Sequence, residues 1–152
     1  QTIGDVKVTS PNPVEVEIRF IMTDGELPTK TVIDGVAAYL QDENIRPLTD
    51  KVTVLAPETV KFNIAFTYYV NLSDQSKAGT IQAEVAQAVA DYIEWQTRTI
   101  GRDINPSELM KRIVAAGAKR AEIISPVFTT VPDTSVARIG TQTVTYGGVE
   151  ND

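Results

Sequence analysis

The stretch Gly101–Pro126, GRDINPSELMKRIVAAGAKRAEIISP, contains the clearest local folding signals in this sequence. Asn105 can cap a helix that starts at the following proline. Glu108, three residues after the cap, can return a hydrogen bond to the backbone N–H of Asn105. Gly117 stands where the end of a helix favours a residue with positive φ. We therefore predict a turn, a short capped helix, a second turn and a strand over Ala118–Thr130.

The rest of the chain divides into further helices and strands by the spacing of its apolar residues. Spacing close to 3.6 residues predicts helices over about Leu27–Glu43 and Ala78–Thr99. Alternation of apolar and polar residues predicts the strands, which are Ile3–Val8, Val14–Met22, Lys51–Ala56, Val60–Leu72 and Val136–Tyr146. The strand over Val60–Leu72 is the longest and most regular, so we expect it at the centre of a sheet. Loops are expected at Arg46–Asp50 and Asn71–Lys77.

This order of elements predicts an α+β fold. Strand–helix–strand occurs twice, which is the βαββαβ order of a ferredoxin-like antiparallel sheet with two main helices on one face, here with an extra strand at each end. Each half is expected to make a right-handed crossover. A doubly wound parallel sheet would need strands that are apolar on both faces, whereas these alternate.

We divide the chain into three segments on this basis. Residues 1–12 form a lead-in segment with an edge strand, residues 13–131 form the βαββαβ domain, and residues 132–152 form a C-terminal strand and tail. Gly147, Gly148 and the last three residues, Glu150–Asp152, are expected to fray. The sequence begins with Gln1 rather than Met, so we expect it to be either part of a longer protein or a processed product.

The composition excludes several classes of function. The 152 residues include no Cys and no His, which removes Cys nucleophiles, Ser-His-Asp triads, the usual zinc sites and imidazole acid–base chemistry. The formal net charge of −6 argues against a nucleic-acid binder, because neutralising phosphates requires a basic face. No apolar run approaches the roughly 20 residues that span a bilayer. Chemistry based on carboxylates, Lys, Tyr or Arg remains possible, but no residue in the chain is an obvious catalyst. We predict no enzyme activity, catalytic residue, metal site, cofactor, nucleic-acid partner or membrane span.

The remaining candidates for function are exposed side chains that could contact another protein. We expect them around the end of the long helix and the turn after the short one. Trp95, the only tryptophan, is either at the edge of the core or in contact with a partner. The predicted contact residues are Trp95, Arg98, Arg102, Lys119 and Arg120.

Four segments together resemble the C-terminal region of the baseplate J-like family, the wedge proteins of contractile phage tails and related injection machines. The family's strand and DG-x-LP helix start are similar to residues 10–28, and its "rPltD-x-V-x-V" segment is similar to residues 44–54. Its "G-x-x-i-x-x-S-x-L" segment is similar to residues 101–109, and its "i-x-v-x-y-G" finish to residues 140–148. After the short helix the family often has a Pro-Gly-Val-like turn, where this chain has Ala116-Gly117-Ala118.

The resemblance implies a structural and assembly domain of a baseplate wedge protein in a phage or prophage tail. Its partners would be other wedge and tail proteins, with self-association as a further contact. The location would be the tail baseplate of the virion, assembled in the cytoplasm of the bacterial host. The resemblance implies no catalytic residues in this chain.

Two other uses of the predicted fold remain open at this point. An ACT-like regulatory domain would bind a small molecule at a glycine-containing junction of loop and helix, for which Asp24-Gly25 is the candidate. An acylphosphatase-like enzyme would need an arginine in an anion-binding loop after the first strand. Residues 22–29 contain no arginine, which disfavours the enzyme.

Overall fold

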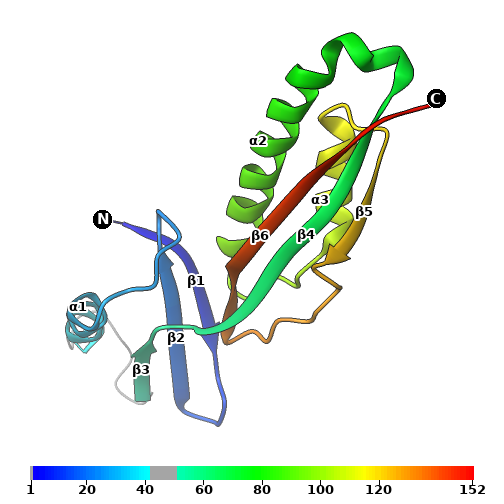
Figure 1. Ribbon diagram of the computed structural model, residues 1–152. Helices are drawn as coiled ribbons and strands as arrows, with labels where there is room; N and C mark the ends of the chain where they lie inside the picture. The colour runs from blue at the N-terminus through cyan, green and yellow to red at the C-terminus, as the bar shows by residue number, and fades with distance from the viewer. Residues whose placement is uncertain (1, 42–50) are drawn as a thin grey trace.

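The part of the chain that the structure describes contains two three-stranded sheets; one helix covers a face of the first sheet and two helices cover a face of the second (Figure 1). The computed structural model describes residues 2–41 and 51–152. The predicted end of the first helix at Glu43 and the predicted loop Arg46–Asp50 lie outside these residues.

The first sheet has the order β1-β2-β3. Its strands are β1 (Ile3–Thr9), β2 (Glu15–Met22) and β3 (Lys51–Leu55); β1 runs antiparallel and β3 parallel to β2. Helix α1 (Lys30–Leu40) begins at the cap Thr29, whose side chain accepts a hydrogen bond from the backbone N–H of Val32. Its apolar stripe packs on Phe20, Met22 and Val54. The predicted strand–helix–strand half therefore forms, and its two strands, β2 and β3, are parallel.

The second sheet has the order β5-β4-β6. Its strands are β4 (Glu58–Asn71), β5 (Arg120–Ser125) and β6 (Ser135–Glu150). Between β4 and β5 lie a 3₁₀ helix, η1 (Leu72–Lys77), and the helices α2 (Ala78–Thr97) and α3 (Pro106–Ala115). The prediction of a central strand is confirmed, because β4 pairs with β5 on one side and β6 on the other.

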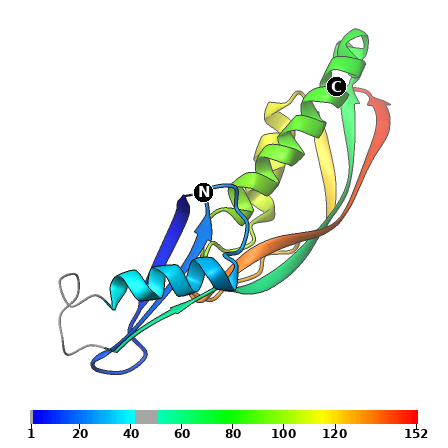
Figure 2. The ribbon, with the colours of Figure 1, turned by 90° about the vertical axis from the view of Figure 1, so that its left-hand side faces the viewer.

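The main core lies between the second sheet and its two helices (Figure 2). Every second residue of β4 from Phe62 to Val70 is buried, which is the pattern of a strand with one covered face. On α2 the predicted apolar stripe is confirmed by four buried residues, Ile81, Val85, Val89 and Tyr92. From α3, Leu109 and Ile113 complete this core.

The α+β class is confirmed, but the expected single antiparallel sheet is wrong. Residues 135–150, counted as an appended strand, pair with β4 along nearly its whole length, from Glu58↔Ser135 to Asn71↔Glu150. A strand has two edges, and β6 pairs with one edge of β4 while β5 pairs with the other. No edge of β4 is therefore free to pair with the first sheet. A strand–helix–strand unit with one helix gives parallel strands. Here two helices, α2 and α3, lie between β4 and β5, and β5 runs antiparallel to β4. The segment borders at residues 12 and 131 stay a prediction.

Two local expectations are corrected as well. Asn105 caps α3 by accepting from the backbone N–H of Ser107 at 3.0 Å, as predicted. Its own N–H, however, donates to Oε1 of Gln96 at 3.0 Å instead of to Glu108. The strand expected over Ala118–Thr130 is confined to Arg120–Ser125, because Pro126 follows it.

Candidate functional site

The structure separates the five predicted contact residues into two groups. Trp95, Arg98 and Arg102 lie at the end of α2, whereas Lys119 and Arg120 lie beside the chain terminus and the 3₁₀ helix η1. Gly117 lies against Ile81 in the first turn of α2, so this second group is at the opposite end of that helix. A 20-residue helix is about 30 Å long. The five residues therefore do not form one basic corner.

Trp95 lies at the edge of the core. It is half-buried against the main core, and its ring is 6.1 Å from the ring of Tyr92. The guanidinium carbon of Arg102 lies 4.2 Å from the centre of the indole ring, and Nη1 of the same arginine donates to the backbone oxygen of Trp95 at 2.6 Å. Stacking and hydrogen bonding thus engage the cation of Arg102 within the chain.

Arg98 takes part in a junction between the two sheets. Its Nη1 donates to the backbone oxygen of Thr23, beyond the end of β2, at 3.3 Å and pairs with Glu94 at 3.1 Å. Arg138 at the start of β6 reaches the same turn and donates to the backbone oxygens of Gly25 and of Thr97. Two arginines of the second sheet's unit therefore bind backbone groups of the first.

The same junction includes an apolar contact and a helix-end contact. Ile21, Ile100 and Val136 are buried together, with exposed fractions of 0%, 5% and 0%. Oδ2 of Asp5 accepts from the backbone N–H of Ile100 at 2.8 Å, and Lys7 lies 3.6 Å from Asp133. The junction thus combines buried apolar surface with directional polar contacts, which holds the two sheets in one orientation.

A polar cleft of about 390 Å³ lies at this junction. Its walls include the turn Asp24–Glu26 and the side chains of Arg98 and Arg138. Burial lowers the pKa of Arg138, while Glu26 and Asp24 act in the opposite direction. The Asp24-Gly25 turn, expected as a small-molecule site, therefore lies beside two arginines that already bind backbone carbonyls.

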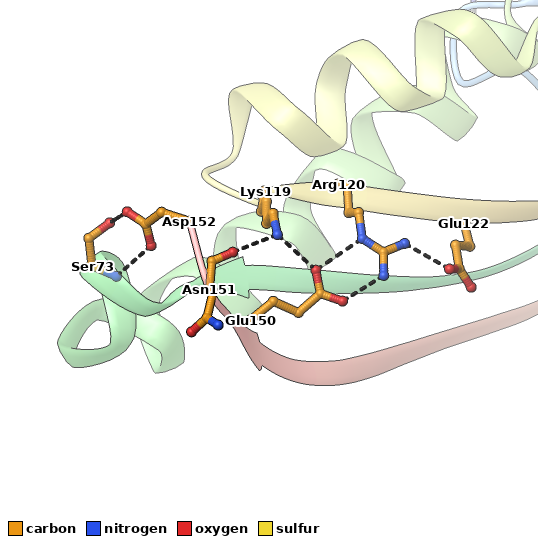
Figure 3. Close-up of polar contacts among 7 residues, drawn as sticks. All are labelled: Ser73, Lys119, Arg120, Glu122, Glu150, Asn151 and Asp152. Carbon is orange, nitrogen blue, oxygen red and sulfur yellow. Dashed lines mark hydrogen bonds and ion pairs between the residues drawn. The ribbon is translucent and has the colours of Figure 1, made fainter.

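The second group of predicted residues belongs to a C-terminal latch, defined here as Ser73, Lys119, Arg120, Glu122, Glu150, Asn151 and Asp152 (Figure 3). Nε and Nη2 of Arg120 donate to the two carboxylate oxygens of Glu150 at 3.0 and 2.5 Å. Nζ of Lys119 donates to Glu150 at 3.1 Å and to the backbone oxygen of Asn151 at 2.7 Å. Asp152 accepts from the backbone N–H of Ser73 at 3.0 Å and from its hydroxyl.

The latch overturns the expectation that the C-terminus frays. The hydrogen bonds of Arg120 and, to a smaller extent, of Lys119 lower the pKa of Glu150 to about 2. Arg120 also lies 4.1 Å above the ring of Tyr69 and pairs with Glu122 at 2.7 Å. The acidic tail looked solvated in the sequence because its cationic partners are some 30 positions away along the chain.

An apolar groove, which the sequence analysis did not identify, lies on the first sheet. Helix α1 covers β2 and β3 but leaves part of β1 open, and a groove of about 510 Å³ results. Ile3, Val6 and Tyr39 at this groove are 44%, 47% and 64% exposed. The alternation in β1 was the available signal, because it places Val6 and Val8 on the face of Phe20 and Ile18.

Among residues 2–41 and 51–152 we find no group of three acidic side chains arranged to hold a metal ion. Within the same residues, no helix is long and apolar enough to cross a membrane.

Comparison with known proteins matches both sheets to one family. The model of the baseplate J-like central domain matches residues 1–56, and that of the baseplate J-like protein C-terminal domain matches residues 62–145. Baseplate protein J of Escherichia phage P2 is 29% identical over 141 residues, covering 92% of this chain. The chain spans 46% of the length of that relative.

A solved structure shares the fold. A chain in the cryo-EM structure of the anti-feeding prophage baseplate, 6-fold symmetrised, superposes with a TM-score of 0.63. The match covers 90% of this chain and 33% of the other at 15% sequence identity. The arrangement of two sheets is therefore found in another protein.

Proposed function

The chain belongs to the baseplate J-like family, and from that membership we propose that it is a structural and assembly part of a contractile-tail baseplate wedge protein. The observation that carries the proposal is the match of two family models, in order, to the two sheets. The P2 baseplate protein and the prophage baseplate chain support it.

The proposed mechanism is mechanical. The chain places two small sheets at a fixed angle through the junction of Arg98, Arg138 and Asp5, and presents their uncovered surfaces to neighbouring subunits. Such a role needs no catalytic group. We propose that the partners are other wedge and tail proteins, that the location is the virion tail baseplate, and that assembly occurs in the host cytoplasm.

The five predicted contact residues enter this proposal in two different roles. We propose that Arg98 and Arg102 set the shape of the surface near the junction, because both are held by backbone carbonyls. We propose that the C-terminal latch, which contains Lys119 and Arg120, keeps the ends of β5 and β6 together beside a partner.

The experiment is a test of particle assembly. The full-length protein that contains this chain would be co-expressed with the adjacent tail genes, and the particles would be purified and imaged by electron microscopy. We expect the intact protein to co-purify in baseplates and the double variant Arg138→Met, Asp5→Ala to reduce their yield. A protein that stays outside every tail complex, with all tail genes expressed, contradicts the proposal.

The alternative is an ACT-like domain that binds a small molecule. Its site would be the polar cleft beside Gly25. A thermal-shift screen with amino acids and nucleotides distinguishes the two functions, because only a binding domain gains stability from one class of ligand.

A further inference from the structure

The last residues of β6 are attached to the sheet differently from the rest of the strand. Gly147 and Gly148 stand next to each other, and the register of β6 with β4 shifts between Tyr146 and Val149. Gly148 has a φ of +101°, and a Cβ atom there would meet no other atom within 4 Å. Glycines at such a bulge change conformation at little steric cost. Residues 149–152 therefore follow a point at which the backbone can turn.

Beyond the glycines, charged groups provide most of the contacts of this segment. Val149 is half-buried and pairs with Val70, and the three residues after it are polar. Glu150 forms ion pairs with Lys119 and Arg120, whose side chains are 28% and 42% exposed. Exposed ion pairs contribute little to stability because water and salt screen them. The segment can therefore leave the sheet at a lower cost than a strand packed in the core.

The cations that hold the segment are positioned without it. The guanidinium of Arg120 lies 4.1 Å above the ring of Tyr69, and its Nη1 donates to Glu122 at 2.7 Å. The backbone N–H of Lys119 donates to the backbone oxygen of Tyr69 at 2.8 Å. These contacts come from β4, β5 and the residue before β5, so they remain when residues 149–152 leave. The result is a carboxylate-binding site that does not depend on its present occupant.

The bound segment shows which chemistry the site recognises (Figure 3). Arg120 donates through Nε and Nη2 to the two oxygens of one carboxylate, that of Glu150. Nζ of Lys119 bridges the same carboxylate and the backbone oxygen of Asn151. The second carboxylate, on Asp152, accepts from Ser73. Side chains two positions apart lie on the same face of an extended strand. The site thus fits an extended segment with carboxylates two positions apart.

We propose that residues 149–152 are an internal ligand of this site, and that an extended acidic segment of another protein displaces them. The incoming segment would place one carboxylate on Arg120 and Lys119 and pair its backbone with β4 beside Val70. Main-chain hydrogen bonds supply affinity in such strand addition, and the side-chain site supplies specificity. In the isolated chain the segment acts as an autoinhibitory contact.

Charge complementarity determines the partner. Removing Glu150 and leaving the site empty would deprive two adjacent cations of the carboxylate that both bind. A neutral or basic strand does not replace that carboxylate, whereas an acidic strand does. The fork of an arginine matches a carboxylate in two parallel hydrogen bonds, which adds geometric selection to the charge.

The test measures binding of a labelled peptide to the purified chain. The probe has the sequence of residues 146–152, YGGVEND, and the control peptide is the neutral YGGVQNN. The chains are the wild type and the double variant Glu150→Gln, Asp152→Asn, which weakens the internal ligand. The matched control is Glu84→Gln, Asp91→Asn, which removes the same two charges from exposed positions of α2. Fluorescence anisotropy reports binding, and circular dichroism verifies that each chain folds.

We expect the double variant at Glu150 and Asp152 to bind the acidic peptide about tenfold or more tightly than the wild type does. In the wild type the tethered segment competes at an effective concentration of about millimolar. The control chain should bind as weakly as the wild type, and the neutral peptide should bind to none of the chains. Adding Arg120→Gln or Lys119→Gln should remove the gain. The lysine variant is the check should the arginine variant misfold, because it leaves Arg120 on Tyr69.

Equal affinities of the double variant and the control chain, or of the acidic and the neutral peptide, would overturn the proposal. So would a gain that survives both substitutions of the cations. Sedimentation velocity on the same samples examines exchange between copies. A wild-type dimer that the double variant abolishes would assign the site to the segment of a second copy and would also overturn the proposal. The measurements use the chain by itself, so their outcome is independent of the proposed baseplate role.

Discussion

Gln96 at the end of α2 allows a sharp test of how α2 and α3 are joined. Its side chain is fully buried, with an exposed fraction of 0%. Its Nε2 donates to the backbone oxygens of Asp103 at 2.9 Å and of Arg102 at 3.3 Å. Its Oε1 accepts from the hydroxyl of Tyr92 and from the N–H of Asn105, both at 3.0 Å. One side chain thus provides hydrogen-bond partners for three backbone groups in the loop that connects α2 and α3.

The perturbation is Gln96→Leu, which keeps the approximate volume and removes every hydrogen bond. The N–H of Asn105 and the carbonyl of Asp103 lose their partner, and each unsatisfied buried group costs about 1–3 kcal/mol. Tyr92 keeps one bond, to the backbone oxygen of Asn105 at 3.1 Å. We therefore expect a loss of about 3 kcal/mol in the free energy of unfolding.

Urea unfolding monitored by circular dichroism and by Trp95 fluorescence measures this loss. With a slope of about 1–3 kcal/mol per molar urea, the midpoint should fall by more than about 1 M. The control is Gln87→Leu on the same helix, where the exposed side chain bonds only to Asp91 and the change should stay within about 0.5 kcal/mol. Equal midpoints for the two variants would refute the argument that the buried glutamine holds the connection.

The remaining predictions concern a cap, the latch and two glycines. Asn105→Ala should lower the free energy of unfolding by about 1 kcal/mol through loss of the helix cap, and an unchanged urea midpoint would contradict this. Arg120 lowers the pKa of Glu150 to about 2, below its ordinary 4.5. A depressed carboxyl pKa stabilises the folded state above the unfolded pKa, so this contribution is present at neutral pH and is lost as the pH falls from about 4.5 to about 2. The difference in urea midpoint between wild type and Glu150→Gln should therefore shrink over that window, and a difference that stays constant with pH would count against the latch. Gly117→Ala should destabilise by more than about 1 kcal/mol because φ is +114°. Gly35→Ala, in open space within α1, should stabilise by about 0.5–1 kcal/mol, and thermal unfolding of both variants shows whether the signs differ.

Much of the local structure could be predicted because its causes are local. The cap at Asn105, the positive φ of Gly117 and the stripe of α2 each depend on residues within a turn or two. The candidate site was predicted less well. Its residues were grouped by closeness in sequence, and α2 separates them in space.

The features that were missed depend on distant residues. In the sequence, Gln96 cannot be distinguished from other polar residues at the end of a helix. Only in the folded chain does the loop after α2 cover it and bind its side chain. Glu150 resembles a frayed acidic tail until β6 lies along β4 and brings it to Arg120. No spacing along the chain carries this information.

The sequence alone therefore determined the helices, most of the strands and the resemblance to the baseplate J-like family. Propensity, capping and apolar period act over a few residues, and the family's motifs can be read in order. The tertiary structure decided which strands pair. Backbone hydrogen bonds between strands are alike in every register, and the alternation of side chains shows which face of a strand is buried but not which strand lies beside it. That choice gave β4 two neighbours from the C-terminal half of the chain and divided one expected sheet into two.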